Sequence, residues 1–236
     1  MIRSFIYSIV YWPIFVMILA IMYPITKLSK KGSYPALLTY RLLTKWTLLC
    51  QKYIIGIDYK VSGLERVKNN QVIIGCNHQS SWETFIFSIL LDNFAMVIKQ
   101  ELLKKPLAGI YFEKLACIPI DRSSPVKAIK TLLKYGKEAY LAGKSIVIFP
   151  NGTRASINES TEYKSGIYAL YKALNIPVVP ATVNSGKFWP RNSFKKSPGI
   201  IELRFKEQIS PGLSKEEFFE QFSKAQEQSV NQIQWT

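Results

Sequence analysis

The chain has 236 residues, enough for one core of the usual domain size, and with 48% hydrophobic residues it is too apolar to be disordered. Its 31 Lys and Arg residues against 16 Asp and Glu give a net charge of +15, which favours anionic partners such as lipid and phosphate groups. There is no zinc-finger spacing, no long basic run and no RNP-like aromatic motif, so we expect neither nucleic acid nor a metal as a partner.

The first predicted element is an uncharged segment between Phe5 and Ile25. A helix of this length reaches roughly the 30 Å of a hydrocarbon core, which predicts a membrane segment. Pro13 lies inside it, so a kinked or re-entrant helix is an alternative to a straight span. Lysines at positions 27, 30 and 31 follow it, against a single Arg3 before it, and this bias places the C-terminal side in the cytoplasm. We therefore expect a protein of the cell (inner) membrane, with the rest of the chain on the cytoplasmic face.

A second helical pattern extends from residue 34 to residue 53. Its apolar stripe is formed by Leu38, Leu42, Trp46 and Leu49. A neighbouring basic edge is formed by Arg41, Lys45 and Lys52. Such a helix fits a membrane interface, and it fits equally an ordinary amphipathic helix that covers a domain core. We expect residues 1–53 to form membrane-associated helices, either one membrane helix or a helical hairpin, and residues 54–236 to form one further domain.

Beyond residue 53, short apolar segments alternate with helical patterns. Strands are predicted for residues 71–76, 94–98, 145–149 and 178–183. Helix starts are marked by Ser124 followed by Pro125, and by Ser214 with Glu217 in a capping-box pattern. This alternation predicts an α/β domain.

His78 is the one histidine of the chain, so any mechanism that needs an imidazole base depends on it. It follows the strand predicted for residues 71–76, and the carboxyl ends of strands are where α/β sites commonly lie. Glu83 could orient the imidazole and stabilise its charged form. The alternative for Glu83 is structural, because Ser80 and Glu83 also fit the two partner positions of a capping box.

Four short blocks resemble those of a known family. His78 followed by four residues and then the acidic Glu83 resembles the HX4D motif of glycerolipid acyltransferases, and especially of the bacterial 1-acylglycerol-3-phosphate acyltransferases. The other three blocks follow in the order of that family, and they are IPIDR (118–122), FPNGTR (149–154) and IPVVP (176–180). The similarity extends over residues 70–213. Two departures are Glu83 in place of the usual Asp and Asn151 in place of the usual Glu.

The resemblance implies a mixed sheet flanked by helices and an acyl transfer without a cofactor. An acyl thioester, either acyl-CoA or acyl-carrier protein, would be the co-substrate, and the sn-2 hydroxyl of lysophosphatidic acid would be the acceptor. His78 would be the general base, with Glu83 orienting it. The substrate phosphate would be held by Arg122, Asn151, Gly152, Thr153 and Arg154. The product would be phosphatidic acid, an intermediate of phospholipid biosynthesis.

Two alternatives stay open because Asn151 removes a negative charge from this site. One is an acyltransferase for another lysolipid, and the other is a weakly catalytic, membrane-bound lipid-binding protein of the same fold. The expected partners are a lysophospholipid, an acyl thioester and an anionic membrane surface.

Overall fold

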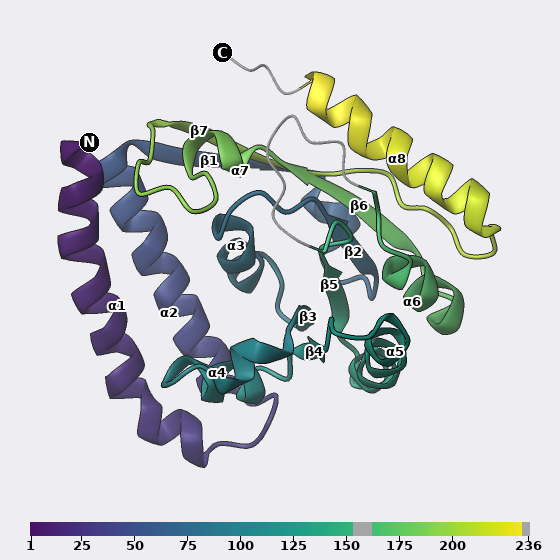
Figure 1. Cartoon of the computed structure of the whole chain (residues 1–236), viewed down its shortest axis with the longest axis horizontal. Coiled ribbons are helices and arrows are strands. Elements are labelled where there is room, and N and C mark those ends of the chain that lie inside the picture. The colour runs from purple at the N-terminus through teal and green to yellow at the C-terminus, as the bar shows by residue number, and fades with distance from the viewer. Residues whose placement is uncertain (153–161, 233–236) are drawn as a thin grey trace.

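A seven-stranded mixed sheet forms the centre of the protein, with the strand order β1-β7-β6-β2-β5-β3-β4 (Figure 1). The computed structural model describes residues 1–152 and 162–232, with side chains up to residue 227. The strands β6, β2, β5, β3 and β4 run parallel, whereas β7 is antiparallel to β6 and parallel to β1. The expected α/β class with a mixed sheet is confirmed. The strands are β1 (Ile57–Ser62), β2 (Ile73–Cys76), β3 (Phe94–Lys99), β4 (Ile118–Ile120), β5 (Ser145–Ile148), β6 (Val178–Val183) and β7 (Gly199–Phe205).

The central strands β2, β5 and β6 are buried along their whole length. Their sequences are continuous apolar runs, as expected for parallel strands that are covered on both faces. The four predicted strands are confirmed as β2, β3, β5 and β6, with their ends shifted by at most two residues. β4, a strand of three residues, lies outside those predictions, and so do β1 and β7. β1 and β7 alternate buried with more exposed residues and therefore lack the apolar runs that identify the central strands.

Helices cover both faces of the sheet, and two hydrophobic clusters fill the space beneath them (Figure 1). Ile74 of β2 packs in one cluster with Trp82 of α3, on the side of α1 and α2. Ile73, the preceding residue, packs in the other cluster with Phe222 of α8, on the side of α5 and α6. The helices are α1 (Ile2–Leu28), α2 (Tyr34–Cys50), α3 (Trp82–Leu90), α4 (Ala108–Lys114), α5 (Pro125–Leu141), α6 (Gly166–Leu174), α7 (Ser185–Phe188) and α8 (Lys215–Gln232).

Two of the predicted helix starts are confirmed by their capping hydrogen bonds. The Ser124 hydroxyl at the start of α5 accepts a hydrogen bond from the Lys127 N–H at 3.4 Å. At the start of α8, the Ser214 N–H donates to the Glu217 carboxylate at 2.8 Å, and the Glu217 N–H donates to the Ser214 hydroxyl at 3.2 Å. Both bonds of a capping box are therefore formed.

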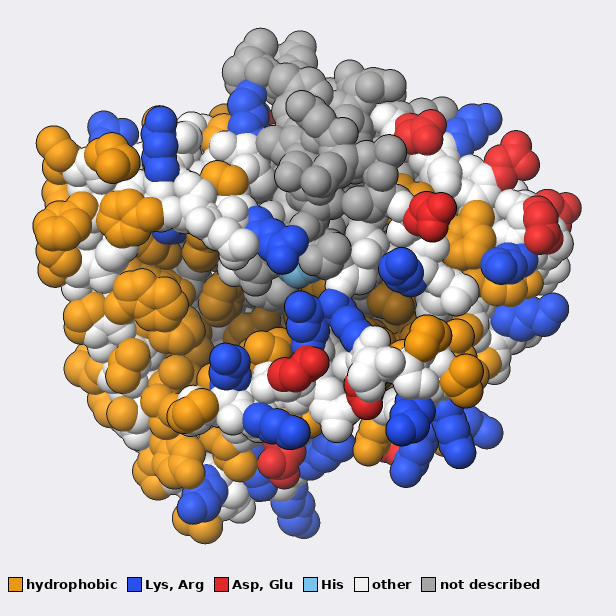
Figure 2. All heavy atoms as spheres, viewed as in Figure 1, with side chains coloured by type: hydrophobic (Ala, Val, Ile, Leu, Met, Phe, Trp, Pro, Cys, Tyr) orange, Lys and Arg blue, Asp and Glu red, His pale blue; other side chains and the backbone are white. Residues whose placement is uncertain are grey.

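α1 lies along the domain with polar and aromatic residues inward and apolar residues outward. Ser4, Tyr7 and Tyr11 are buried, and the Tyr11 carbonyl accepts a hydrogen bond from the indole N–H of Trp46 in α2 at 3.1 Å. Figure 2 shows the resulting apolar surface on the side of the molecule formed by α1 and α2. The exposed large apolar residues of α1 are Ile2, Phe5, Ile6, Ile9, Trp12, Val16, Met17, Ile21, Ile25 and Leu28. A surface helix of a water-soluble protein would have its apolar residues inward and its polar residues outward.

The apolar stripe of α2 is divided, because Trp46 packs against the domain core whereas two of its leucines stay at the surface. Leu42 and Leu49 are 38% and 50% exposed. The buried side of α2 carries smaller and hydroxyl-bearing residues, among them Thr44 and Thr47. The helix therefore covers part of the core, and its exposed leucines add to the outward surface of α1.

The basic edge expected along residues 34–53 is paired within the protein at two of its three positions, and Lys52 lies beyond the end of α2 at Cys50. Arg41 forms an ion pair with Asp92 at 2.8 Å and donates to the Ser88 carbonyl at 2.9 Å, which docks α2 against the end of α3. Lys52 forms an ion pair with Asp58 at 2.8 Å. Arg41 therefore serves packing within the protein, whereas Lys52 is paired in an ion pair at the surface.

Candidate active site

His78 lies two residues beyond β2, at the carboxyl edge of the parallel strands, and pairs with Glu83 in the first turn of α3. Its Nδ1 is 3.0 Å from Oε1 of Glu83. The His78 side chain is 15% exposed, whereas the Glu83 side chain is fully buried. Nε2 of His78 has no hydrogen-bond partner among the described residues. Because the carboxylate occupies Nδ1, Nε2 is the nitrogen that a substrate can reach.

The Glu83 carboxylate accepts hydrogen bonds on both of its oxygens. Oε1 accepts from the backbone N–H groups of Gln79 at 2.5 Å and Ser80 at 2.7 Å. Oε2 accepts from the hydroxyls of Ser80 at 3.1 Å and Ser185 at 2.6 Å. Burial alone would raise the pKa of Glu83, but the contact with His78 and these hydrogen bonds lower that pKa below its ordinary value. Glu83 is therefore ionised at neutral pH and aimed at the imidazole.

Both alternatives for Glu83, the helix cap and the partner of the imidazole, are combined in the structure. α3 begins at Trp82 with Ser81 as its N-cap, one residue later than the sequence predicts. Ser80 still donates its N–H to Glu83, while its hydroxyl accepts from the Trp82 N–H at 2.8 Å. The carboxylate that completes the helix start is thus the one that contacts His78.

The loop that carries His78 is held in place by the segment that follows β6. The Asn77 amide exchanges two hydrogen bonds with the Val183 backbone, at 2.9 and 2.7 Å. The side-chain amide oxygen (Oε1) of Gln79 accepts from the Gly186 N–H at 3.2 Å. A side chain at Gly186 would place its Cβ 2.9 Å from the Cβ of Gln79, so this close approach requires glycine. Both neighbours of His78 are therefore fixed.

The turn after β5 brings the predicted phosphate-binding block next to the imidazole. The ring of Phe149 stacks on that of His78, with centroids 4.3 Å apart. Asn151 is buried, and Gly152 adopts a φ of +72°, with its N–H donating to the Phe149 carbonyl at 3.0 Å. The Gly152 carbonyl accepts a hydrogen bond from the Arg122 guanidinium. Arg122, Asn151 and Gly152 thus lie in or against the turn whose Phe149 stacks on His78, and Thr153 and Arg154 lie outside the described residues.

Two residues of the site, Ser185 and Phe149, are assigned no role by the sequence motifs. Ser185 is separated from Glu83 by 102 positions, so sequence spacing gives no indication of their contact. Phe149 belongs to a predicted block, but an apolar residue at the end of a strand is ordinarily part of the core. In the part of the chain that the structure describes, no cluster of three or more His, Cys, Asp and Glu side chains could hold a metal ion.

An imidazole backed by a buried carboxylate, stacked on a turn that binds a guanidinium, is suited to removing a proton from a hydroxyl of an anionic substrate. Residues 58–184 match the model of the Acyltransferase family, and the chain belongs to this family. The class of protein is therefore that of the acyltransferases.

Two curated relatives have the same name. The chain is 36% identical over 159 residues to the 1-acyl-sn-glycerol-3-phosphate acyltransferase of Pseudomonas aeruginosa, over 67% of this chain and 62% of the relative. It is 30% identical over 137 residues to that of Saccharomyces cerevisiae, over 57% of this chain and 45% of the relative. The alignments with the first curated relatives thus span 50–62% of their length.

A solved structure has the same fold. The crystal structure of the 1-acyl-sn-glycerophosphate (LPA) acyltransferase PlsC from Thermotoga maritima matches with a TM-score of 0.77. The match covers 100% of this chain and 99% of that one at 18% sequence identity. The common architecture therefore includes the N-terminal helices as well as the sheet.

Proposed function

We propose that the protein transfers a fatty acyl group from an acyl thioester to the sn-2 hydroxyl of lysophosphatidic acid, giving phosphatidic acid for phospholipid biosynthesis. The observation that carries this proposal is the pair of His78 and buried Glu83, with His78 stacked on Phe149 at the start of the turn that Arg122 contacts at Gly152. Membership of the Acyltransferase family and the names of the relatives support the same reaction.

His78 acts as the general base through Nε2. It takes the proton of the sn-2 hydroxyl as that oxygen attacks the thioester carbonyl, a contribution usually of about 10²–10⁴ in rate. Glu83 keeps the proton on Nδ1 and stabilises the imidazolium that forms. The tetrahedral intermediate then expels the thiolate, and the imidazolium returns a proton to the sulfur. The acyl group passes directly from sulfur to oxygen, without an acyl-enzyme.

The phosphate of the acceptor binds at the turn after β5. Arg122 is placed there by its hydrogen bond to the Gly152 carbonyl, and its other N–H groups can make charge-assisted bonds to phosphate. Asn151, Thr153 and Arg154 complete this site in our proposal. The acyl thioester, acyl-CoA or acyl-carrier protein, is a co-substrate, and no cofactor takes part.

Competition among acceptors tests the proposal. Purified protein would be given labelled acyl-CoA and equal amounts of lysophosphatidic acid and of lysolipids with choline, ethanolamine and glycerol head groups. We expect phosphatidic acid as the main labelled ester. Preference for another head group would establish a second candidate function, which the neutral Asn151 favours, and saturable lipid binding without any ester would establish a lipid-binding protein.

Arg122→Ala should raise the KM for lysophosphatidic acid roughly 10- to 100-fold, since one charge-assisted hydrogen bond contributes about 1.5–3 kcal/mol. The KM for the acyl donor should change little. Arg122→Lys should recover only part of the loss, because lysine lacks the planar fork of donors. Lys130→Ala on the exposed side of α5 controls for the change in net charge. Equal effects on both KM values would place the acceptor phosphate elsewhere.

We propose that the outward side of α1 and α2 attaches the protein to the cytoplasmic leaflet of the cell membrane. α1 is the one described helix long and apolar enough to cross a membrane. It is held to the domain at its first turn and again at Leu19, however, since the Ser4 hydroxyl accepts from the Lys196 N–H and the Leu19 carbonyl accepts from the Tyr111 hydroxyl. A helix bound along its length offers one side to lipid, which favours an interfacial helix over a straight span.

Replacing Phe5 and Ile9 by glutamate should move the protein from the membrane fraction to the soluble fraction without unfolding it. Both side chains are outward on α1, at 59% and 57% exposure, so a charge there opposes lipid contact and not core packing. Val126→Glu with Leu141→Glu is a matched control, because these apolar residues of α5 are also exposed. Sedimentation with vesicles measures the result. Unchanged binding of the α1 variant would contradict the proposed attachment.

A further inference from the structure

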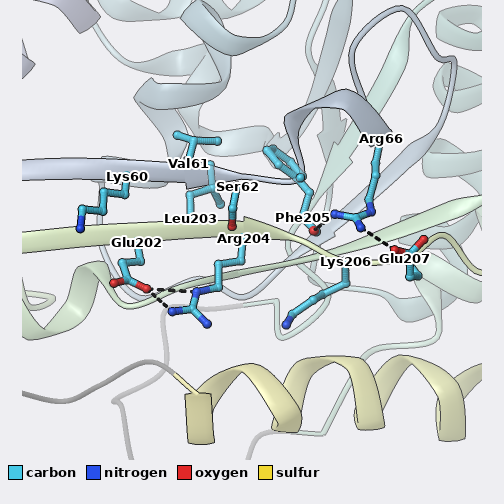
Figure 3. Close-up of a pocket in the computed structure, with 11 residues that line it drawn as sticks. Lys60, Val61, Ser62, Arg66, Glu202, Leu203, Arg204, Phe205, Lys206 and Glu207 are labelled. Atoms are coloured by element: carbon cyan, nitrogen blue, oxygen red, sulfur yellow. Dashed lines mark hydrogen bonds and ion pairs between the residues drawn. The ribbon is translucent and has the colours of Figure 1, made fainter.

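A basic groove of about 690 Å³ lies at the β1–β7 edge of the sheet, away from the turn after β5 (Figure 3). In β7, Leu203 and Phe205 pack in the cluster that contains α3, so the alternate residues Glu202, Arg204 and Lys206 point to the opposite face. Figure 3 shows these three side chains on the side of β7 along which α8 runs. The charged residues of the basic groove are Lys60, Arg66, Glu202, Arg204, Lys206 and Glu207.

The two carboxylates of the basic groove are each paired with an arginine. Nε of Arg204 is 3.0 Å from Oε2 of Glu202. Arg66 forms an ion pair with Glu207 and also donates to the Phe205 carbonyl at 3.2 Å. The arginines are therefore held in fixed positions, and they retain N–H groups that can bind an anion.

Lys60 and Lys206 have no ion-pair partner among the described residues. Partial burial lowers the pKa of Lys206, and the nearby charges of Arg204 and Arg66 lower it further. The lining holds four cations against two carboxylates, and Glu65, which also pairs with Arg66 at 3.4 Å, leaves a local excess of one positive charge. An anionic ligand would relieve this repulsion.

An alternative role for charges on an edge strand is to prevent its pairing with another sheet, without any ligand. Such protection does not require a concave surface, whereas the basic groove has a volume within the range of about 300–1,000 Å³ typical of small-molecule sites. Its cations come from β1, β7 and the segments that follow each strand. The shape and charge therefore fit a phosphorylated ligand of nucleotide size.

The register of the strands places the basic groove near the catalytic edge. Cys76 at the end of β2 lies opposite Ala181 of β6, and the next residue of β6, Thr182, lies opposite Arg204 of β7. Arg204 is therefore at the level where β2 ends, two strands away, or about 10 Å across the sheet. His78 follows two residues after Cys76. A pantetheine arm is long enough to connect the two places.

We propose that the basic groove binds the phosphorylated nucleotide of an acyl-CoA donor while the thioester of that donor lies at His78. This inference rests on the proposed acyl transfer, and it assigns the donor to CoA and its phosphates to Lys60, Arg66, Arg204 and Lys206. The acceptor phosphate and the donor phosphates thus bind on different sides of the imidazole.

Calorimetric titration with free CoA, which does not depend on turnover, tests this assignment. The double variant Lys60→Ala, Lys206→Ala should weaken CoA binding by roughly tenfold or more, because it removes both unpaired cations. The same variant should raise the KM for palmitoyl-CoA and leave the KM for lysophosphatidic acid unchanged. Lys130→Ala with Lys137→Ala on α5 makes the same change in net charge at exposed positions and should leave CoA binding unaltered.

Three results would overturn the proposal: no binding of CoA to the wild-type protein, unchanged binding by the Lys60, Lys206 variant, or equal weakening by the two double variants. The first of these would be expected if the donor is solely an acyl-carrier protein. Failure of the proposed acyl transfer is distinguishable, because it would appear as absent ester product while CoA binding is still measured.

Discussion

His78→Ala should lower the rate of acyl transfer by about 10²–10⁴-fold while the protein stays folded and membrane-bound. The substitution removes the one imidazole, whose Nε2 has no hydrogen-bond partner among the described residues. The fold should tolerate the change, since His78 lies in a loop that its neighbours Asn77 and Gln79 hold through their own side chains. Turnover with labelled palmitoyl-CoA, together with thermal unfolding, measures both parts of this prediction.

Added imidazole provides the control for His78→Ala. The small molecule should restore part of the activity, because the contacts of Glu83 with Ser80 and Ser185 keep the carboxylate in place without His78. A variant that retained more than about a tenth of wild-type turnover would show that proton removal by this residue is not required.

Glu83→Gln should lower turnover by roughly 10²-fold with a much smaller loss of stability. The amide oxygen can replace Oε1, which accepts from the N–H groups of Gln79 and Ser80 and from Nδ1 of His78. The amide nitrogen then faces the hydroxyls of Ser80 and Ser185, which can rotate to accept. The geometry is preserved, but the charge that stabilises the imidazolium is lost.

The pH dependence of stability gives a second measurement on Glu83→Gln. The folded protein lowers the pKa of Glu83 below 4.5, so the ionised carboxylate stabilises the fold above that pH. This contribution is lost as the pH falls through the lowered pKa. The difference in free energy of unfolding between wild type and variant should therefore shrink in acid.

Glu83→Leu is the contrasting variant, since it leaves the surrounding donors without an acceptor and should destabilise the protein strongly. Unchanged turnover of Glu83→Gln would leave this residue with a capping role only.

The centre of the site could be predicted from the sequence because its signals are local. The strand before His78 is a continuous apolar run, and the five-residue interval to Glu83 fixes the pair across the start of one helix. The blocks that contain Arg122 and Gly152 are also local, and the structure brings these two residues into contact.

The contacts that support the site could not be predicted in this way, because they join distant segments. The bond of Ser185 to Glu83 and the clamp of Val183 on Asn77 depend on β6 lying beside β2, which a single sequence does not state. β7 is also not predicted, because its register against β6, a pairing between separate segments, decides which of its residues face the core.

The sequence gives only a weak indication of which side of α1 faces the domain. Ser4, Tyr7 and Tyr11 recur at helical spacing inside an otherwise apolar run, and they form the inward face. Charge and length alone indicate a membrane segment, but they do not separate a span from a helix that lies along its own domain.

Analysis of the lipid product tests the proposed function most directly. Purified protein would be incubated with 1-oleoyl lysophosphatidic acid and carbon-13-labelled palmitoyl-CoA, and the lipids would be examined by mass spectrometry before and after digestion with a lipase specific for the sn-2 ester. We expect labelled phosphatidic acid whose label the lipase releases entirely as palmitate, and none of this product with His78→Ala. Labelled free palmitate without an ester, or equal ester formation by the variant, would contradict transfer to the sn-2 hydroxyl by His78.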